Sequence, residues 1–302
     1  MEREKYPLRL DPTRKQIIWG GRRLIENYGI PFDGENLAEA WVLSVHPEGN
    51  NTIINGPHAG ITLGDYLGID ANTTDFGIMI KLIDAADRLS IQVHPVKTEL
   101  WYVMDAEPGA TLVYGLKDKF DEQQFRAALA DGTVQELLNY VPVKPGDVFF
   151  IPQGLVHAIG AGILIAEIQQ NSNVTYRVYD YNRRQKDGSL RQLHVDEAMG
   201  VIRDFSHEQI EALRFSTHCK RDESLLASCE LFRVNRYKLD GTLEYRGEPG
   251  EFANVLCLSG DATLTAYGKT EQLAAGYSYF VPADFGTLEI SGRAEVIVTA
   301  SK

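Results

Sequence analysis

The chain has 302 residues, 44% of them hydrophobic, which is enough to bury the core of one large domain or of two modest ones. Its formal net charge of −12 argues against the basic surface that nucleic-acid binding requires, although a few local cations could hold a small anion. The charged start MEREKYPLRL lacks an apolar core of signal-peptide length, and no uncharged apolar run approaches the ~20 residues of a membrane span. The sequence therefore predicts a cytoplasmic protein that binds neither nucleic acid nor a membrane.

Short segments rich in β-branched and aromatic residues, with Gly, Pro or Asp at their ends, predict strands. In chain order they lie at residues 88–95, 99–105, 110–115, 147–152 and 163–170. Such a density of strands predicts a mainly β fold, arranged as an antiparallel barrel or sandwich.

A few short helices are predicted between and after these strands. One runs from Asp121 to Ala130. Two more begin at capping-box sequences, in which a Ser or Thr is followed three residues later by Glu or Gln. These are Thr133 with Glu136, and Ser206 with Gln209.

The two halves of the chain share a pattern that predicts an internal repeat. In each half a strand segment, at residues 109–115 and 260–268, is followed by a Gly-x5-Pro strand, at 146–152 and 276–282. The polar, then helical, stretch from about residue 181 to 220 is the expected connection between two copies of one β unit.

A polar strand face and a later histidine provide the strongest functional signal. Alternation along the strand puts Ser90, Gln92 and His94 on one face, and Glu99 follows after a tight turn. His157 comes after the second strand and a Pro/Gly turn. Taken alone, the polar face is typical of a strand with one solvent-exposed side, and His157 is typical of a histidine in the protein core. Together they spell HxH(x)4E, with Gln92 in the first His place, and then G(x)5PxGxxH, a paired signature that resembles the cupin metal motif.

Two imidazoles, a carboxylate and an amide oxygen suit one Zn²⁺ ion with an open coordination position. Mn²⁺, Fe²⁺ or Co²⁺ could occupy the same set. In the second copy Pro282 is followed by Ala-Asp-Phe-Gly, so we expect that copy to hold no metal. The prediction is therefore two cupin, jelly-roll-like β-barrels: a metal-binding catalytic domain with helical insertions over residues 1–215, and a metal-free domain over residues 216–302.

Longer stretches of the sequence resemble type I mannose-6-phosphate isomerases, particularly their short bacterial members. They lie at residues 18–21, 38–47, 90–95, 97–102, 151–158 and 167–181. The resemblance covers most of residues 17 to 183 and is weak beyond about residue 220. It implies that the zinc ligands are Gln92, His94, Glu99 and His157. It also implies that the sugar pocket is lined by Trp19, Glu39, Ser90, Lys97, Glu167 and Arg177.

The implied reaction interconverts mannose 6-phosphate and fructose 6-phosphate through an enediol. The metal would supply an electrophile. The proton would be moved by Glu167 or by a water on the zinc. Glu167 lies on an apolar strand, where burial would raise its pKa toward the range of a general base. Alternatively, Glu167 is only a buried ion-pair partner of Arg177 or Lys97. Arg177 could fork onto phosphate or onto the enediolate oxygens, unless it simply pairs with Asp180. Lys97 could hold a hydroxyl or the phosphate as a point charge.

One departure from the family pattern concerns the pocket mouth. Members usually carry an insertion between the positions of His94 and Lys97, and this chain has only a short turn there. Two other functions stay open: a cupin isomerase or Fe²⁺ oxygenase acting on another small substrate, and a catalytically silent sugar-phosphate-binding regulator. The expected partner is a small phosphorylated sugar, bound by a monomer or a small homo-oligomer.

Overall fold

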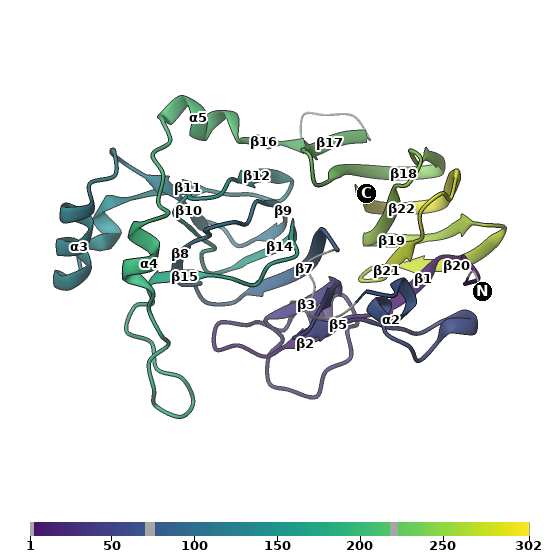
Figure 1. The fold of residues 1–302 in the computed structure, drawn as a ribbon, viewed down its shortest axis with the longest axis horizontal. Coiled ribbons are helices and arrows are strands. Elements are labelled where there is room, and N and C mark those ends of the chain that lie inside the picture. Colours follow the sequence, from purple (N-terminus) through teal and green to yellow (C-terminus); the bar gives the residue numbers. More distant parts are fainter. Residues whose placement is uncertain (1–2, 70–75, 218–222, 302) are drawn as a thin grey trace.

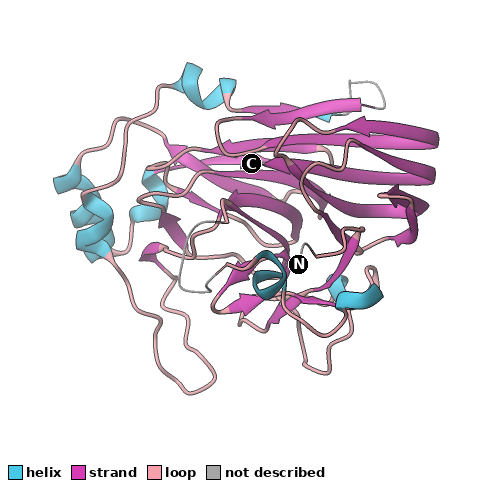
Figure 2. Cartoon of the chain, turned by 45° about the vertical axis from the view of Figure 1, so that its right-hand side comes forward, coloured by secondary structure: helices cyan, strands magenta, loops and turns pink. Residues whose placement is uncertain are grey.

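A computed structural model describes residues 3–69, 76–217 and 223–301 and shows a mainly β protein. Figure 1 shows two groups of sheets side by side, with the chain passing from one to the other near β16 and β17. Helices are short and lie at the edges of the sheets (Figure 2). They are α1 (Arg23–Glu26), α2 (Leu63–Leu67), α3 (Glu122–Asp131), α4 (Val195–Met199) and α5 (His207–Ala212), with the 3₁₀ turns η1 (Gly56–His58) and η2 (Val134–Leu137).

Two antiparallel sheets build the half that carries the predicted site. The larger has the order β16 (Arg214–Ser216), β12 (Asp147–Ile151), β9 (Glu99–Ala106), β14 (Ile163–Gln170), β7 (Ile78–Ala85), β3 (Glu39–Leu43) and β2 (Thr13–Lys15). The smaller has the order β11 (Leu138–Pro142), β10 (Thr111–Leu116), β13 (His157–Ala158), β8 (Ile91–Val93) and β15 (Tyr176–Tyr179). We call them the seven-stranded and the five-stranded sheet.

The third large sheet contains the C-terminal strands. Its order is β17 (Glu223–Ser228), β18 (Arg233–Arg246), β22 (Thr287–Ser301), β19 (Phe252–Ala266), β21 (Ser278–Val281), β1 (Leu8–Asp11) and β6 (Thr52–Ile53), with β20 (Lys269–Ala274) paired to β19. A small hairpin joins β4 (Val45–His46) and β5 (Gly49–Asn50). We call the third sheet the C-terminal sheet, although β1 and β6 come from the start of the chain.

The expected secondary structure is confirmed with one exception. All five predicted strands are present, although β8 is shorter than its predicted segment. Helix α3 begins at Asp121, whose side chain accepts from the Gln124 N–H, and α5 begins with the complete capping box of Ser206 and Gln209. The helix predicted after Thr133 is wrong: this segment is the single 3₁₀ turn η2. The Thr133 hydroxyl donates to the Asp131 carboxylate, and the chain enters β11 directly after the turn.

The pairing order of the strands repeats between the two halves. Strand β9 pairs with β12 and the following β10 pairs with β11. The first part of the long strand β19 likewise pairs with β21, and its second part pairs with β20. The two Gly-x5-Pro strands, β12 and β21, thus hold matching places. The closure of each half into its own barrel, and the division between residues 215 and 216, stay predictions.

The apolar core is divided by the seven-stranded sheet. On its outer face Leu164, Ala166 and Ile168 of β14 belong to the cluster that contains Leu256 and Phe280 of the C-terminal sheet. The opposite face of the same strand carries Ile163 and Ile165, which pack in a separate cluster with residues of the five-stranded sheet. Because side chains alternate along a strand, Glu167 and Gln169 share this inner face.

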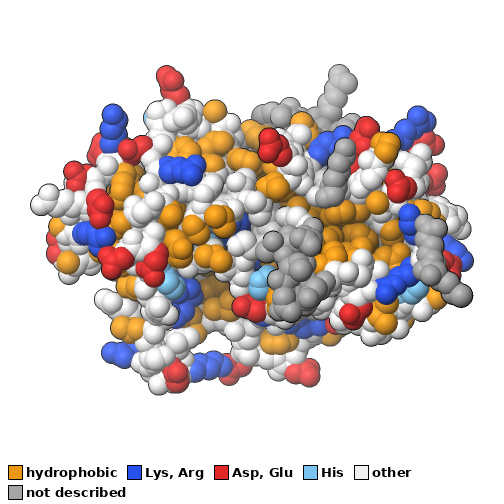
Figure 3. All heavy atoms as spheres, in the orientation of Figure 1, with side chains coloured by type: hydrophobic (Ala, Val, Ile, Leu, Met, Phe, Trp, Pro, Cys, Tyr) orange, Lys and Arg blue, Asp and Glu red, His pale blue; other side chains and the backbone are white. Residues whose placement is uncertain are grey.

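Acidic and basic side chains are interspersed on the face shown in Figure 3. None of the helices in the described ranges is long and apolar enough to cross a membrane. The cytoplasmic location itself stays a prediction.

Neighbouring leucines of β17 test how the C-terminal sheet packs. Leu226 is 4% exposed within the core that joins the two halves, whereas Leu225 points the other way and is 50% exposed. We expect Leu226→Ala to lower the free energy of unfolding by about 2–5 kcal/mol, because it leaves a cavity in a packed core. Leu225→Ala should change it by no more than about 0.5 kcal/mol. Urea titrations followed by circular dichroism measure both, and equal effects would contradict this packing.

Candidate metal centre and active site

The inner face of the seven-stranded sheet carries a row of polar and aromatic side chains. Lys81 of β7 lies opposite Glu167 of β14, and Glu167 lies opposite Trp101 of β9. One pair further along, Gln169 lies opposite Glu99. Because directly opposed residues of antiparallel strands share a face, the register brings both carboxylates to the same side of the sheet.

The facing wall is the five-stranded sheet, where Gln92 lies opposite His157 on one side and opposite Arg177 on the other. The turn before His157 depends on Gly154, whose φ is +85° and whose N–H donates to the His94 carbonyl at 3.1 Å. A Cβ at Gly154 would lie 2.7 Å from the Val201 carbonyl oxygen. Glycine therefore allows the turn that brings His157 beside His94.

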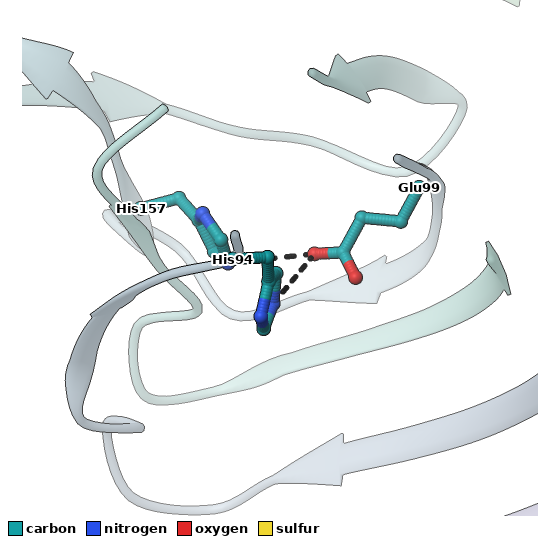
Figure 4. Close-up of side chains that lie close together, drawn as sticks. All are labelled: His94, Glu99 and His157. Carbon is teal, nitrogen blue, oxygen red and sulfur yellow. Dashed lines mark ion pairs between the residues drawn. The ribbon is translucent and has the colours of Figure 1, made fainter. Parts of the chain in front are cut away.

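His94, Glu99 and His157 converge between the two walls (Figure 4). Their candidate ligand atoms all lie within 4.8 Å of one another, and all three side chains are buried. Glu99 Oε1 is 3.7 Å from His94 Nε2 and 3.4 Å from His157 Nε2.

The backbone fixes which nitrogen of each imidazole carries a proton. His94 Nδ1 is 2.9 Å from the Val174 carbonyl oxygen, and His157 Nδ1 is 2.8 Å from that of Leu155. A carbonyl only accepts, so each Nδ1 is the protonated donor, and in the neutral ring Nε2 presents a lone pair toward Glu99. Histidines that bind metals are commonly oriented by this kind of hydrogen bond.

These donors fit a divalent cation. His94 Nε2 and Glu99 Oε1 are buried without a hydrogen-bond partner, an arrangement that a cation between them would satisfy. The Gln92 amide approaches His157 Nε2 to 3.3 Å through its nitrogen. Rotating the Gln92 amide by half a turn would exchange its nitrogen and oxygen, so that the oxygen faces His157 Nε2. The oxygen would then complete the mixed N/O donor set.

Burial and charge keep these groups in the protonation states that metal ligands need. Burial, and then Lys97, lower the pKa of His94 to about 3, and burial also lowers that of His157. Burial would raise the pKa of Glu99, but the charge of Lys97 outweighs it and holds this pKa well below the usual range. Lys97 Nζ is 2.8 Å from Glu99 Oε2 and donates to Gln169 Oε1 at 3.0 Å.

A cavity of about 370 Å³ opens above these residues. Its lining includes seven residues that the sequence predicted: Trp19, Glu39, Ser90, Gln92, Lys97, Glu167 and Arg177. It also includes polar and aromatic residues that the sequence analysis missed, among them Lys81, Trp101, Arg191 and His194. His94, Glu99 and His157 lie behind this lining, so Gln92 and Lys97 connect them with the cavity.

Glu167 pairs with a residue that the sequence analysis did not consider. Lys81 Nζ is 3.5 Å from Glu167 Oε2 and 3.8 Å from Glu39 Oε2. The Trp101 indole N–H donates to Glu167 at 3.0 Å. Burial, and then the charge of Glu99, raise the pKa of Glu167 to about 7 despite Lys81. The one available signal was Lys81 itself, a lone cation within the apolar run 78–83.

Arg177 is not paired with Asp180, the alternative considered from sequence. Its Nε donates to Ser90 Oγ at 3.1 Å and its Nη1 donates to the Gln192 carbonyl at 2.9 Å. Asp180 instead binds the guanidinium groups of Arg183 and Arg191. Arg177 therefore brings its positive charge to the cavity wall with neutral hydrogen-bond partners.

Comparisons with known proteins agree with the fold. A model described as the mannose-6-phosphate isomerase cupin domain matches residues 222–301, which with the antiparallel sheets makes this a cupin protein. A model of the phosphomannose isomerase type I catalytic domain matches residues 8–114.

Curated relatives match along almost the whole chain. A mannose-6-phosphate isomerase of Streptococcus mutans is 31% identical over 98% of this chain and 98% of its own length. One of Bacillus subtilis is 32% identical over 97% and 98%. The crystal structure of the B. subtilis mannose-6-phosphate isomerase superposes with a TM-score of 0.83 at 29% identity, covering 98% of this chain and 99% of that one. The chain belongs to the type I mannose-6-phosphate isomerase family.

Metal content tests the donor set directly. We expect His157→Ala and Glu99→Ala to lose most of the metal that the parent protein retains, because each removes one donor from a buried set. His58→Ala is the matched control, since His58 stacks on Tyr6 at η1 and contributes nothing to the cluster. Metal per chain after dialysis, measured by plasma mass spectrometry, gives the result. Full retention in the first two variants would contradict the assignment.

Proposed function

We propose that this protein is a zinc-dependent aldose–ketose isomerase that interconverts mannose 6-phosphate and fructose 6-phosphate. The observation that carries the proposal is the convergence of His94, Glu99 and His157 beside a cavity that also contains Glu167 and Arg177. Membership of the family adds the substrate, because the relatives are named for mannose 6-phosphate.

In this proposal Gln92, His94, Glu99 and His157 hold one divalent ion. When bound, the ion supplies a Lewis acid that polarises the sugar oxygens and stabilises developing negative charge. Zn²⁺ suits two imidazoles and a carboxylate, while Mn²⁺, Fe²⁺ and Co²⁺ bind the same donor types.

Glu167 is the proposed base that moves the proton between C1 and C2. Its pKa near 7 places the carboxyl where it can both take and return a proton at neutral pH. The Trp101 N–H fixes one oxygen, and Lys81 compensates the charge of the ionised form. Glu167 takes the proton from C2 while the C1 carbonyl oxygen gains a proton, which gives the enediol. The carboxyl then returns its proton to C1 as the C2 hydroxyl gives up its own proton and becomes the ketone.

The remaining predicted residues bind and orient the sugar. Arg177 stabilises negative charge on the substrate, and Ser90 fixes its guanidinium through Nε. Lys97 lines the cavity beside the proposed ligand Glu99 and can hold a substrate oxygen as a point charge. Trp19 and Glu39 also line the cavity.

Family membership favours isomerisation of mannose 6-phosphate over the two alternatives that the sequence left open, a cupin isomerase or oxygenase acting on another substrate and a silent regulator. An oxygen-consuming iron protein would support the oxygenase, and substrate binding without turnover would support the silent regulator. The deciding measurement is an assay of mannose 6-phosphate conversion to fructose 6-phosphate, before and after a chelator and after adding back each candidate metal. We expect activity to be lost with the metal and restored by zinc.

Arg177→Ala should lower turnover by at least ~10²-fold while leaving metal content unchanged, because it removes one oriented charge stabiliser. Arg184→Ala is the control, since the Arg184 guanidinium donates to the nearby Gly188 carbonyl in an exposed loop outside the cavity lining. Steady-state kinetics with mannose 6-phosphate measure both variants. Near-normal turnover of Arg177→Ala would remove this residue from the mechanism.

Lys81 lies between two carboxylates, Glu167 and Glu39. Comparing variants of the two distinguishes a general base from a residue that only neutralises the lysine. Glu167→Gln should lower kcat by about 10²–10⁴-fold, the usual effect of removing a general acid–base group. Glu39→Gln, at the other side of the same lysine, should lower it much less. If Glu167 served only to neutralise Lys81, the two variants would lose similar activity at equal metal content.

A further inference from the structure

Gln169 of β14 is a fully buried amide to which the proposed chemistry gives no role. It lies on the inner face of the seven-stranded sheet, directly opposite Glu99 of β9. The cavity lining does not include Gln169, so any effect on a bound sugar passes through a neighbouring side chain. Buried polar groups keep hydrogen-bond partners, and the partners of this amide therefore indicate what it does.

The backbone fixes which way the Gln169 amide points. Its Nε2 donates to the Gln170 carbonyl at 2.9 Å and to the Ser172 carbonyl at 2.8 Å. Both carbonyls can only accept, so the nitrogen and oxygen of the amide cannot be exchanged without losing two hydrogen bonds. The turn that supplies these carbonyls is closed by the Ser172 N–H, which donates to the Gln170 carbonyl at 2.7 Å. Gln169 Oε1 is therefore an acceptor with a fixed position.

This acceptor orients the ammonium group of Lys97, whose Nζ donates to Gln169 Oε1 at 3.0 Å. Lys97 Nζ also lies 2.8 Å from Glu99 Oε2, whereas the two imidazoles face Oε1 (Figure 4). Within the described residues neither oxygen of Glu99 has a hydrogen-bond partner, so its contact with Lys97 is an ion pair without hydrogen-bond geometry. Charge attraction sets little direction, whereas a hydrogen bond depends on angle. Gln169 therefore supplies the directional contact.

Holding one hydrogen of the Lys97 ammonium group decides where the other two point. Lysine has a flexible four-carbon stem and three ammonium hydrogens, so one charged neighbour leaves its orientation open. Lys97 lines the cavity although its side chain is buried. With one hydrogen on Gln169 Oε1, the ammonium group no longer rotates freely, and its remaining hydrogens keep a set direction relative to the cavity.

We infer that Gln169 is a positioning residue of the isomerase: it holds Lys97 in the orientation in which the ammonium group meets an oxygen of the bound sugar. The identity of that sugar rests on the proposed function, whereas the contact between Gln169 and Lys97 does not. A charged donor that is oriented before the sugar binds stabilises developing negative charge without reorganising during the reaction.

Gln169→Met keeps the length of the side chain and removes both the acceptor and the donors. We expect kcat per bound metal to fall about 10- to 100-fold, as a misplaced group near the reacting atoms can cause, with a smaller change in KM. Asn254→Leu is the matched control, since Asn254 is also fully buried but donates to Ser278 Oγ in the C-terminal sheet. It should leave kcat and KM unchanged. Parental kcat in Gln169→Met, or an equal loss in Asn254→Leu, would overturn the inference.

A double-mutant cycle distinguishes positioning of Lys97 from a general loss of packing. Because Gln169 acts through Lys97, adding Gln169→Met to Lys97→Met should lower kcat per bound metal no further. Additive losses would overturn the inference. Gln169→Glu provides a further variant in case Gln169→Met does not fold. It keeps an oxygen for Lys97, so its kcat should stay well above that of Lys97→Met, and an equally large loss would also count against the positioning role.

Crystal structures of the metal-loaded parent and of Gln169→Met test the contact without turnover. We expect Lys97 Nζ to lie beside residue 169 in the parent and to leave this place, or to occupy several places, in the variant. Displacement of Lys97 in a protein that does not isomerise mannose 6-phosphate would overturn the proposed function alone. Isomerisation at the parental rate by Gln169→Met, with Lys97 unmoved, would overturn the positioning role alone.

Discussion

The site depends on one buried carboxylate that faces two imidazole lone pairs. Glu99 Oε1 lies 3.7 Å and 3.4 Å from the Nε2 atoms of His94 and His157, and the backbone holds the protons of both rings on the far nitrogen. Three electron-rich atoms at this separation repel one another unless a cation lies among them. Lys97 compensates only the other oxygen of Glu99. Repulsion between these three atoms therefore destabilises the folded protein, and a bound metal ion would remove it.

The seven-stranded sheet connects this chemistry with the rest of the molecule. Along β14, Glu167 and Gln169 face the cavity, while Ala166 and Ile168 pack in the core shared with the C-terminal sheet. Because side chains alternate along a strand, β14 contributes residues to the cavity on one face and to the apolar core on the other. Because the outer face is buried against a second sheet, the strand that carries the proposed base is packed on both of its faces. The C-terminal sheet contributes to the site through this support, although its own residues lie outside the cavity lining.

The sequence was most informative where the determinants are local. Gln92, His94, Glu99 and His157 are recognisable because a strand and a Pro/Gly turn set their spacing within short segments. Lys81 could not be assigned from the sequence, because its partners Glu39 and Glu167 come from two other strands and depend on register. Arg191 and His194 were missed for another reason: their segment has irregular structure, so no strand or helix periodicity in the sequence indicates which way their side chains point. The error at Thr133 has a different cause: a local capping signal was overridden by the need to enter β11.

The pairing of strand β1 constrains the order in which the chain can fold. Leu8 pairs with Phe280, so β1 finds this partner only after the long stretch of chain between the two strands has been synthesised. Contacts between such distant parts of a chain form slowly, because a large loop must close first. Until then the edge of β1 is unpaired on the side that β21 will cover, where it can associate with other chains. Expression at lower temperature, or with chaperones that shield this edge, should therefore raise the yield of folded protein.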